Sequence, residues 1–472
     1  MIRSSQMSAL TGFAAAVCTG VLLHLALPPR SISILIWIAL LPLLWAAQRA
    51  GSARTAFYLG LTAGLVLCVL SLFWLTRLFG PAAVSLWVLL ALWPALFALW
   101  YFSTASWPRL PRAVAAAAVW VGLEFFRSEL WWFEFTWLTP GSAFHSTPAV
   151  LQWASIIGVY GLSFIVVLVN GLLAAALGGS WAAGLAALIM AIALYAGGRT
   201  LTPEVAPGDI RVAAVQHEDY ASGRLYQLSE QAAAERRDFL IWPEGAMSIP
   251  ALDTAALDPL AGLARRWNTH LIAGAIVGSS PMARQNPEDC ALVFDPEGKY
   301  LGRHTKVHLV PLMEKTFFGG GFARRPAREV FPTTHGVAGV QICFDENFTD
   351  LSRRLTGLGA EFFLVPSYDP AEWGNVERLQ HAALLSFRAV ESRRWIVRAS
   401  SSGPSEAIDP AGRRVASLAL NKEGVLTATI AARKDRTIYH RFGWVLPYLC
   451  VAVTVALFGA VFYLGEAKGY LA

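Results

Sequence analysis

The sequence predicts a polytopic α-helical membrane domain of about eight spans, joined to an outer α/β domain. Hydrophobic residues make up 55% of the 472 residues and charged residues only 15%, with a mean hydropathy of +0.48. A soluble globule carries about a quarter charged residues. The acidic residues are almost absent from 1–200, whereas 204–443 has the charge density of a soluble domain. We therefore expect a membrane domain at 1–200, a second domain at 201–444, and a last span with a tail at 445–472.

Seven apolar runs precede the polar domain and one follows it. They are residues 10–27, 31–47, 56–77, 83–103, 112–128, 155–177, 181–197 and 445–464. Each is close to the 17–25 residues that cross a bilayer, although 31–47 and 112–128 are at the short limit. The first run lacks a small-residue cleavage site and is followed by another span, which argues against a cleaved signal peptide.

Basic residues beside the spans predict the orientation. If the N-terminus is cytoplasmic, the outside loops hold mainly Arg30 and Arg77. The inside segments then hold six basic residues: Arg3, Arg49, Arg54, Arg109, Arg112 and Lys468. This excess favours cytoplasmic termini and an outward-facing domain, which is periplasmic if the chain lies in a bacterial inner membrane. Many of the basic residues behind the net charge of +6 lie beside spans, where they set the orientation, so the charge does not indicate nucleic-acid binding.

The aromatic segment 127–144, RSELWWFEFTWLTPGSAF, follows the fifth span. Two interpretations remain open for it. It is either an interfacial tryptophan belt or a re-entrant or surface-lying segment that shapes a lipid-facing cavity.

Strands and helices alternate through the outer domain. The expected strands are 209–216, 239–245, 270–278, 290–307 as a hairpin, 336–344, 361–368, 395–401, 405–417 and 424–430. The expected helices are 227–238, 257–267, a segment ending near 358, and 375–393. This alternation, with long apolar strands, predicts a layered α/β sandwich.

Cysteines are too few and too scattered for a disulfide framework. Cys18, Cys68 and Cys450 lie inside apolar runs and are expected to be small core residues. Cys290 and Cys343 belong to the polar domain, and Cys343 ends an apolar strand in VQICFDENF.

Three polar residues stand at expected strand ends: Glu244 in IWPEG, Lys306 in GRHTKVHLVP, and Cys343. Polar groups at strand ends commonly form the active site of an α/β scaffold. Each has a structural alternative: a helix N-terminal carboxylate, an exposed hairpin lysine, or a buried cysteine. Their joint occurrence favours a site in which a carboxylate base and an ammonium activate a thiol.

These segments resemble the nitrilase, or carbon–nitrogen hydrolase, superfamily, in which Glu, Lys and Cys follow one another in this order. WPEGAMSIP (242–250) is similar to the glutamate segment of that superfamily. KVHLVPLME (306–314) is similar to the K-x-HLVPFGE segment of the apolipoprotein N-acyltransferase family. The apolar stretch 151–175 and the stretch that begins LQHAALLSFRAV at Leu379 are also similar to that family.

The resemblance implies a four-layer α-β-β-α sandwich with Glu244, Lys306 and Cys343 as the catalytic triad. It also implies ping-pong transfer of an acyl chain through a cysteine thioester. The expected donor is a phospholipid, typically phosphatidylethanolamine, and the expected acceptor is the N-terminal amine of a diacylglyceryl-apolipoprotein. No cofactor and no metal are expected, since His304 and His308 lack spaced partners and could equally face solvent.

Glu314 matches the family's second glutamate, an auxiliary acid, and Phe344 and Asp345 stand where Tyr and Glu are common. LMEK replaces the usual FGEY, and RFGW (441–444) replaces RFGD. These departures bear on the acceptor pocket. The segment FFGGGFARRP (317–326) is either a mobile arm or a glycine-rich surface loop.

Three other functions remain open. They are a membrane-tethered amidase or thioesterase that uses water, an acyltransferase with another amine acceptor, and a non-catalytic scaffold. Retention of Glu244, Lys306 and Cys343 argues against the scaffold.

Overall fold

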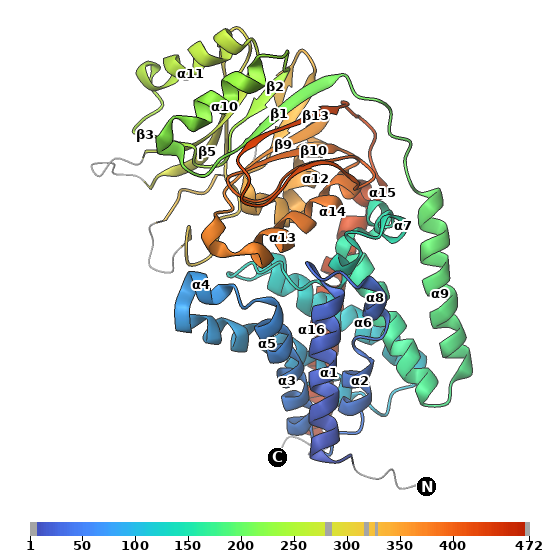
Figure 1. Cartoon of the computed structure of the whole chain (residues 1–472). Coiled ribbons are helices and arrows are strands. Elements are labelled where there is room, and N and C mark those ends of the chain that lie inside the picture. The colour runs from blue at the N-terminus through green and yellow to red at the C-terminus, as the bar shows by residue number, and fades with distance from the viewer. Residues whose placement is uncertain (1–6, 279–285, 316–320, 326–328, 468–472) are drawn as a thin grey trace. The chain divides into compact units, whose positions relative to one another are not determined.

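The computed structural model describes residues 7–278, 286–315, 321–325 and 329–467. Their contacts divide the chain into two compact units (Figure 1), one of Met1–Leu201 with Phe442–Ala472 and one of Thr202–Arg441. Half of the glycine-rich segment 317–326, namely 317–320 and 326, lies outside the described residues, so its two interpretations stay open.

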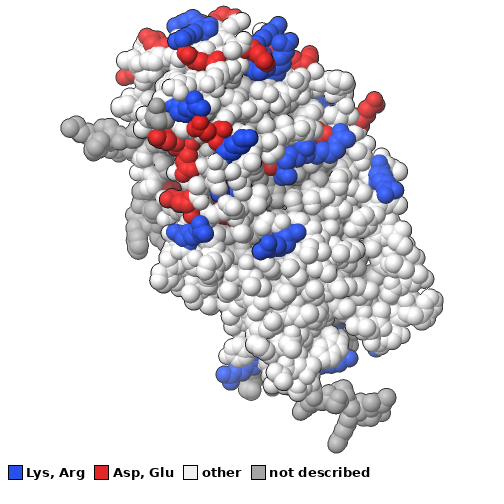
Figure 2. Space-filling view, in the orientation of Figure 1, with Lys and Arg blue, Asp and Glu red and all other residues white. Residues whose placement is uncertain are grey.

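The first unit is entirely helical in its described part. Its α-helices are α1 (Ala9–Ala26), α2 (Leu41–Ala47), α3 (Ala53–Ser71), α4 (Leu75–Phe79), α5 (Ala83–Ser103), α6 (Arg109–Phe125), α7 (Pro148–Leu151), α8 (Ala154–Leu177), α9 (Trp181–Thr200) and α16 (Leu446–Ala467). Large apolar side chains point outward from it; Trp181, Leu188 and Ile189 of α9 are all exposed. Figure 2 shows the same contrast, since charged side chains gather over the α/β unit and the helical unit is largely without them.

Six segments in the described chain are long and apolar enough to cross a membrane: Ala9–Ala26, Ala53–Ser71, Leu75–Ser103, Ala154–Leu177, Trp181–Thr200 and Gly443–Val461. The expected span 31–47 is instead a 3₁₀ helix, Ser33–Trp37, followed by the short α2, which has a proline in its first turn. The expected span 112–128 corresponds to α6, which has 17 residues. The chain is therefore a multi-pass membrane protein in which two of the eight expected spans are short.

The structure also bears on the cysteines of this unit and on its aromatic segment 127–144. Cys68 and Cys450 are buried, as predicted, but Cys18 is exposed because it faces outward from α1. The segment 127–144 packs its rings against helices of the same unit, with ring centroids 5.6 Å apart for Trp93–Trp131 and for Trp74–Trp137. Its position relative to the bilayer stays a prediction.

The second unit contains two β-sheets. The first has the order β13-β1-β2-β4-β5-β6, with β3 beside β4. Its strands are β1 (Ile210–Gln216), β2 (Phe239–Ile241), β3 (Met247–Ile249), β4 (His270–Val277), β5 (Glu288–Phe294), β6 (Tyr300–Thr305) and β13 (Gly424–Ile430). The second has the order β12-β11-β10-β9-β8-β7. Its strands are β7 (Phe331–Thr333), β8 (Gly336–Val340), β9 (Phe362–Ser367), β10 (Trp395–Ser400), β11 (Ser405–Ile408) and β12 (Arg414–Leu418).

Helices cover the outer face of each sheet, which gives the expected α-β-β-α sandwich (Figure 1). The α-helices in the described part of this unit are α10 (Arg224–Ala233), α11 (Thr254–Trp267), α12 (Thr349–Gly357), α13 (Asn375–Ala383), α14 (Leu385–Ser392) and α15 (Ile438–Arg441). Apolar side chains of α10 and α11 pack on the first sheet, and those of α12 and α14 pack on the second. A third apolar cluster, which includes Val212 and Leu364, fills the space between the sheets. Burial of both sheet faces explains the long apolar strands.

Candidate active site

The strand directions bring the predicted site residues to one edge of the sandwich. β2 is parallel to β4, and β6 has the same direction because two antiparallel pairings separate it from β4. β8 and β9 are parallel in the second sheet. Glu244 follows β2, Lys306 follows β6 and Cys343 follows β8. Carboxyl ends of parallel strands share an edge, so segments far apart in the sequence meet there.

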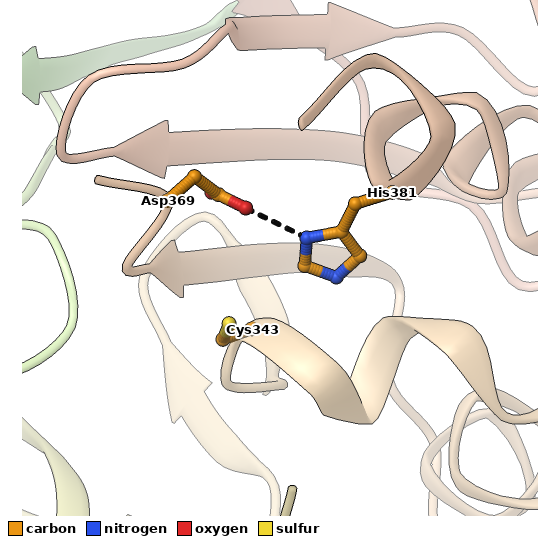
Figure 3. A group of neighbouring side chains, drawn as sticks. All are labelled: Cys343, Asp369 and His381. Carbon is orange, nitrogen blue, oxygen red and sulfur yellow. Dashed lines mark hydrogen bonds and ion pairs between the residues drawn. The ribbon is translucent and has the colours of Figure 1, made fainter. Parts of the chain in front are cut away.

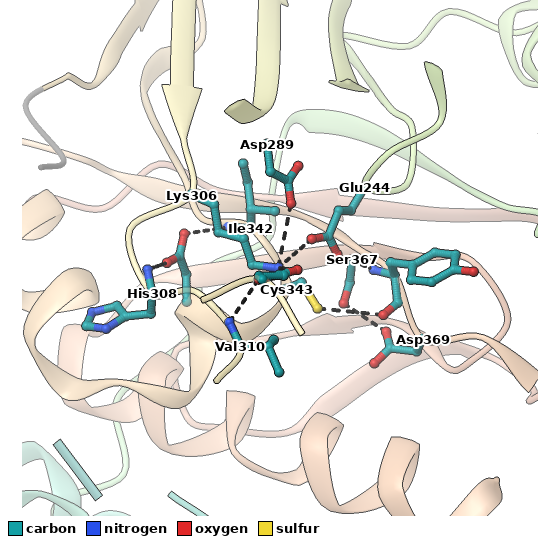
Figure 4. A network of polar contacts seen from close by, with 12 residues as sticks. Glu244, Asp289, Lys306, His308, Val310, Ile342, Cys343, Ser367 and Asp369 are labelled. Carbon is teal, nitrogen blue, oxygen red and sulfur yellow. Dashed lines mark hydrogen bonds and ion pairs between the residues drawn. The ribbon is translucent and has the colours of Figure 1, made fainter. Parts of the chain in front are cut away.

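The structure brings Glu244, Lys306 and Cys343 into contact (Figure 4). Lys306 Nζ donates to Glu244 Oε1 at 2.6 Å, and the Tyr368 backbone bonds both Glu244 and the Cys343 thiol. The side chains of all three are buried, Lys306 being only 1% exposed. Lys306 Nζ also donates to Glu314 Oε1 at 2.7 Å, so the predicted auxiliary acid is a direct neighbour of the lysine.

The backbone of Tyr368 orients both the Glu244 carboxylate and the Cys343 thiol. The Tyr368 N–H donates to Glu244 Oε2 at 2.7 Å, and its carbonyl oxygen lies 3.7 Å from Cys343 Sγ. On the other side, Gly274 of β4 lies directly beneath the Glu244 segment. A Cβ there would be 2.0 Å from Pro243 O, so only glycine lets the segment approach β4 this closely.

Burial and charge fix the resting protonation of the site. Burial and the adjacent Glu244 carboxylate raise the pKa of Cys343 well above that of an ordinary thiol. Burial also opposes ionisation of Glu244, but the Lys306 ammonium and hydrogen bonds hold its pKa below its usual range. Burial opposes the charge on Lys306 as well, yet Glu244 and Glu314 raise its pKa well above normal. A neutral thiol therefore rests beside an ionised carboxylate, the arrangement that base-assisted nucleophilic attack requires.

Cys343 has a strained backbone. Its φ is +46°, a left-handed conformation that is uncommon for residues other than glycine. It begins the 3₁₀ turn Cys343–Asn347, so the chain turns sharply at the sulfur. Such conformations persist only where the surroundings hold them in place.

Asp345 supplies much of that restraint. One of its oxygens accepts from the backbone N–H groups of Val307, at 3.0 Å, and His308, at 2.8 Å. The other accepts from the Ile342 N–H at 3.0 Å and from His304 Nε2 at 3.2 Å. This carboxylate therefore ties the chain after Lys306 to the chain before Cys343. The third auxiliary residue, Phe344, is buried and packs edge-on against Phe348.

We expect Asp345→Asn to lower the unfolding free energy by about 2–4 kcal/mol at neutral pH, because backbone donors lose an acceptor. Burial opposes ionisation of Asp345, but its hydrogen bonds and the nearby histidines lower its pKa. The stability that Asp345 contributes is thus fully present at a pH above the ordinary carboxyl pKa, and it is lost as the pH falls below that value. Thermal unfolding in detergent should show a difference from wild type that shrinks below about pH 4. The exposed Glu372→Gln is the control, and a pH-independent difference would contradict this role.

His304, within β6, and His308, just after it, differ from expectation. His304 and His308 do not face solvent: they are 2% and 6% exposed. His304 contacts Asp345, and His308 Nε2 lies 2.9 Å from Asp350 Oδ1. The sequence gives no sign of this burial because both acidic partners lie about forty residues further along the chain.

A second polar network lies next to the sulfur (Figure 3). His381 Nδ1 is 2.7 Å from Asp369 Oδ1, and the other Asp369 oxygen accepts from Arg398 at 2.7 Å. Potential ligand atoms of Cys343, Asp369 and His381 lie within 4.8 Å of one another. Arg398 Nη2 is nevertheless 2.9 Å from His381 Nδ1, so a metal ion there would face a guanidinium.

A second group of potential ligands, Glu244, Asp289 and Glu314, surrounds the Lys306 ammonium, which already supplies the positive charge. Neither group suits a metal well, and the expected independence from metals stays a prediction.

Sequence reasoning missed several residues of this site, in particular Asp289, Tyr368 and Asp369. Tyr368 and Asp369 directly follow β9, so the strand-end argument could have included them. Asp289 is found only from the hairpin register, in which Cys290 pairs with Thr305 and Asp289 therefore adjoins Lys306. Arg398 lies within the mostly apolar strand β10, and His381 is one of several polar residues of α13, so neither gave a comparable signal.

The α-β-β-α sandwich with a carboxylate, an ammonium and a thiol at one edge defines a domain of the carbon–nitrogen hydrolase class. Residues 211–438 match the family model "Carbon-nitrogen hydrolase", and residues 19–172 match "Apolipoprotein N-acyltransferase N-terminal domain". The chain is 31% identical to the apolipoprotein N-acyltransferase of Geobacter metallireducens, over 93% of this chain and 92% of that protein. The chain belongs to the apolipoprotein N-acyltransferase family.

A second relative agrees with this assignment. The apolipoprotein N-acyltransferase of Gloeobacter violaceus is 28% identical, over 97% of this chain and 95% of that protein. Among solved structures, Saccharomyces cerevisiae Nit3, a member of branch 10 of the nitrilase superfamily, matches with a TM-score of 0.41 and 22% identity. That match covers 48% of this chain and 91% of the Nit3 chain.

Proposed function

We propose that this protein transfers an acyl chain from a phospholipid to the N-terminal amine of the diacylglyceryl-cysteine of an apolipoprotein. The observation that carries the proposal is the Lys306 ammonium, held by Glu244 and Glu314, together with the buried Cys343 thiol that the Tyr368 backbone links to Glu244. Membership of the family supports the choice of acceptor, since the relatives are named apolipoprotein N-acyltransferases.

In the first half-reaction, Cys343 Sγ attacks the carbonyl carbon of the sn-1 ester while Glu244 takes the thiol proton. The carbonyl oxygen becomes an oxyanion and accepts a hydrogen bond from Lys306. An ammonium has three N–H donors, and Glu244 and Glu314 use two, so one serves the oxyanion. The ester C–O bond then breaks, and the glycerol oxygen leaves with the proton from Glu244. The products are a thioester on Cys343 and a lysophospholipid.

In the second half-reaction, the neutral N-terminal amine attacks the thioester carbonyl. Glu244 accepts a proton from the nitrogen and delivers it to sulfur as the C–S bond breaks. The same three groups therefore serve both steps, as in other ping-pong acyl transfers. Phosphatidylethanolamine is the proposed donor.

The proposed location is a bacterial inner membrane, with the catalytic domain on the periplasmic face and both termini in the cytoplasm. The basic residues beside the spans support this orientation. Both substrates are lipids anchored in a membrane, so a domain tethered at each end by apolar helices can meet them without extracting them.

The test offers purified protein a phospholipid with a labelled sn-1 chain and a diacylglyceryl-cysteine peptide with a free N-terminal amine. We expect label in an amide on the peptide, and none on a matched peptide whose amine is acetylated. Release of labelled fatty acid alone, with no labelled peptide, would show a hydrolase that uses water. Label on an unrelated amine but not on the peptide would show a different acceptor.

A further inference from the structure

Asp289 is a buried carboxyl group of the site to which the proposed mechanism assigns no step. It lies on β5 with 2% of its surface exposed, and its backbone carbonyl accepts from the Lys306 N–H at 2.9 Å. Its Oδ2 is 3.6 Å from Lys306 Nζ, beyond hydrogen-bonding distance. Figure 4 shows its side chain pointing toward the lysine and Glu244.

The three carboxyl groups around Lys306 do not receive equal numbers of hydrogen bonds. Glu244 receives hydrogen bonds from Lys306 and the Tyr368 N–H, and Glu314 receives them from Lys306 and the Val310 N–H. Among the residues that the structure describes, Asp289 Oδ1 is buried and receives none. A buried carboxylate without donors is strongly disfavoured, so of the three groups Asp289 is the one best suited to carry a proton.

The contact between Asp289 and Glu244 leads to the same conclusion. A carboxylate oxygen of Asp289 lies within 4.8 Å of one of Glu244, a separation at which two ionised carboxylates repel each other. An ionised carboxylate can only accept hydrogen bonds, so a bond between two carboxyl groups requires a proton on one of them. Glu244 contacts the ammonium at 2.6 Å and is the better anion.

We propose that Asp289 is held as a neutral acid that donates a hydrogen bond to Glu244 and thereby keeps Glu244 ionised and positioned to receive the Cys343 proton. A donor to the charged form of a carboxyl group favours that form. Asp289 is therefore a positioning residue, since it acts through Glu244. This role deepens the proposed function and relies on it only for the activity measurement below.

The charges that face Asp289 agree with this protonation state. Burial and the negative charge of Glu244 raise the pKa of Asp289 well above its usual range, and the Lys306 ammonium offsets them only in part. Glu314 adds a further negative charge. On β5 itself, Glu288 binds Arg303 at 2.9 Å and Arg325 at 2.6 Å. The other neighbour on β5, Cys290, contacts Thr305.

The experiment compares Asp289→Asn, Asp289→Ala and the exposed control Glu297→Gln in the full-length protein in detergent. The first readout is the pH dependence of Cys343 alkylation by iodoacetamide, measured on the Cys343 peptide by mass spectrometry in a Cys18→Ser background. The second is the pH dependence of the acyl-transfer rate. The alkylation readout needs no acyl substrate, so it stands even if acyl transfer fails.

We expect Asp289→Asn to keep both pH profiles within about 0.3 pH unit of wild type, because its amide is a neutral donor of the same shape. Asp289→Ala removes the donor, so the acidic limb of the transfer profile should move up by about one to two pH units. If both variants instead shift alkylation equally toward lower pH, Asp289 is ionised and the proposal is wrong. Equal loss of activity without any shift would show a structural role only and would overturn it too.

A measurement on wild type keeps the proposal testable if a variant fails to fold. Protein labelled with ¹³C at the aspartate carboxyl carbons should show the infrared carbonyl band of a protonated acid at pH 7 in a detergent without esters. The absence of that band would overturn the proposal. If the band disappears in folded Asp289→Asn, it belongs to Asp289. If the band persists in that variant, it belongs to another residue and contradicts the proposal.

Discussion

Cys343→Ala is expected to abolish acyl transfer while the protein remains folded and inserted in the membrane. The sulfur forms and breaks the covalent bond to the acyl chain in the proposed mechanism, and removal of such a nucleophile lowers kcat by roughly 10⁶-fold. The structural effect should be small, because alanine fits the buried position and the +46° backbone conformation is no harder for alanine than for cysteine. The measurement is transfer of a labelled acyl chain by purified wild type and variant.

Two controls separate loss of chemistry from loss of structure. Thermal unfolding and membrane extraction should be the same for Cys343→Ala, wild type and Cys290→Ala, which changes the other cysteine of the domain. Intact mass spectrometry should find an acyl adduct on wild type and on Cys290→Ala but not on Cys343→Ala. Cys343→Ser should also fail to transfer, because a hydroxyl is much harder to deprotonate than a thiol. Wild-type transfer by Cys343→Ala would exclude Cys343 as the nucleophile.

Lys306→Met is expected to lower the acyl-transfer rate by at least about 10²–10³-fold, the usual loss when an oxyanion donor is removed. It should also destabilise the domain. Lys306 is 1% exposed and lies within 4 Å of carboxyl oxygens of Glu244, Asp289 and Glu314, which the variant leaves without a cation. Loss of one partner from a buried ion pair typically costs about 3–5 kcal/mol. Methionine keeps most of the side-chain volume, so the loss of stability reports the removal of the positive charge and not a change in packing.

The pH dependence of stability distinguishes this charge effect from a packing defect. Without the ammonium, the carboxyl groups of Glu244, Asp289 and the partly exposed Glu314 should have folded-state pKa values above those of the unfolded chain. Stability is then retained at low pH and lost as the pH rises. Thermal unfolding of Lys306→Met should therefore be near that of wild type at about pH 4 and fall well below it at pH 8. Lys299→Met, an exposed lysine in the same hairpin, is the matched control. A deficit that does not vary with pH would contradict the electrostatic explanation.

Much of this arrangement could be predicted because it depends on local patterns. The apolar strands and the order Glu244, Lys306, Cys343 are visible in the sequence, and each residue does follow a strand. The strand expected at 336–344 ends at Val340, since the chain leaves the sheet before the sharp turn at Cys343. The helix expected at 375–393 is two helices, α13 and α14. The first difference concerns an element end, where assignments commonly differ by one or two residues, and the second is a break inside the expected helix at Leu384.

Residues that act through distant partners could not be predicted in the same way. The resemblance places Asp345 among the auxiliary site residues but gives no sign of its partners: it is fully buried and bonded to the chain after Lys306. The burial of His304 and His308 has the same cause. Asp289 belongs to no recognisable sequence motif, and it is placed beside Lys306 only by the pairing of β5 with β6.

The amino-acid sequence by itself determined that apolar spans accompany an α/β domain, and which carboxylate, ammonium and thiol stand at strand ends, because hydropathy and strand patterns are local properties of the chain. Only the tertiary structure decided the protonation of the site. That depends on burial and on charges from β2, β5, β6 and β8 that meet at one edge of the sandwich, and distances between such distant segments are fixed only when the two sheets pack together.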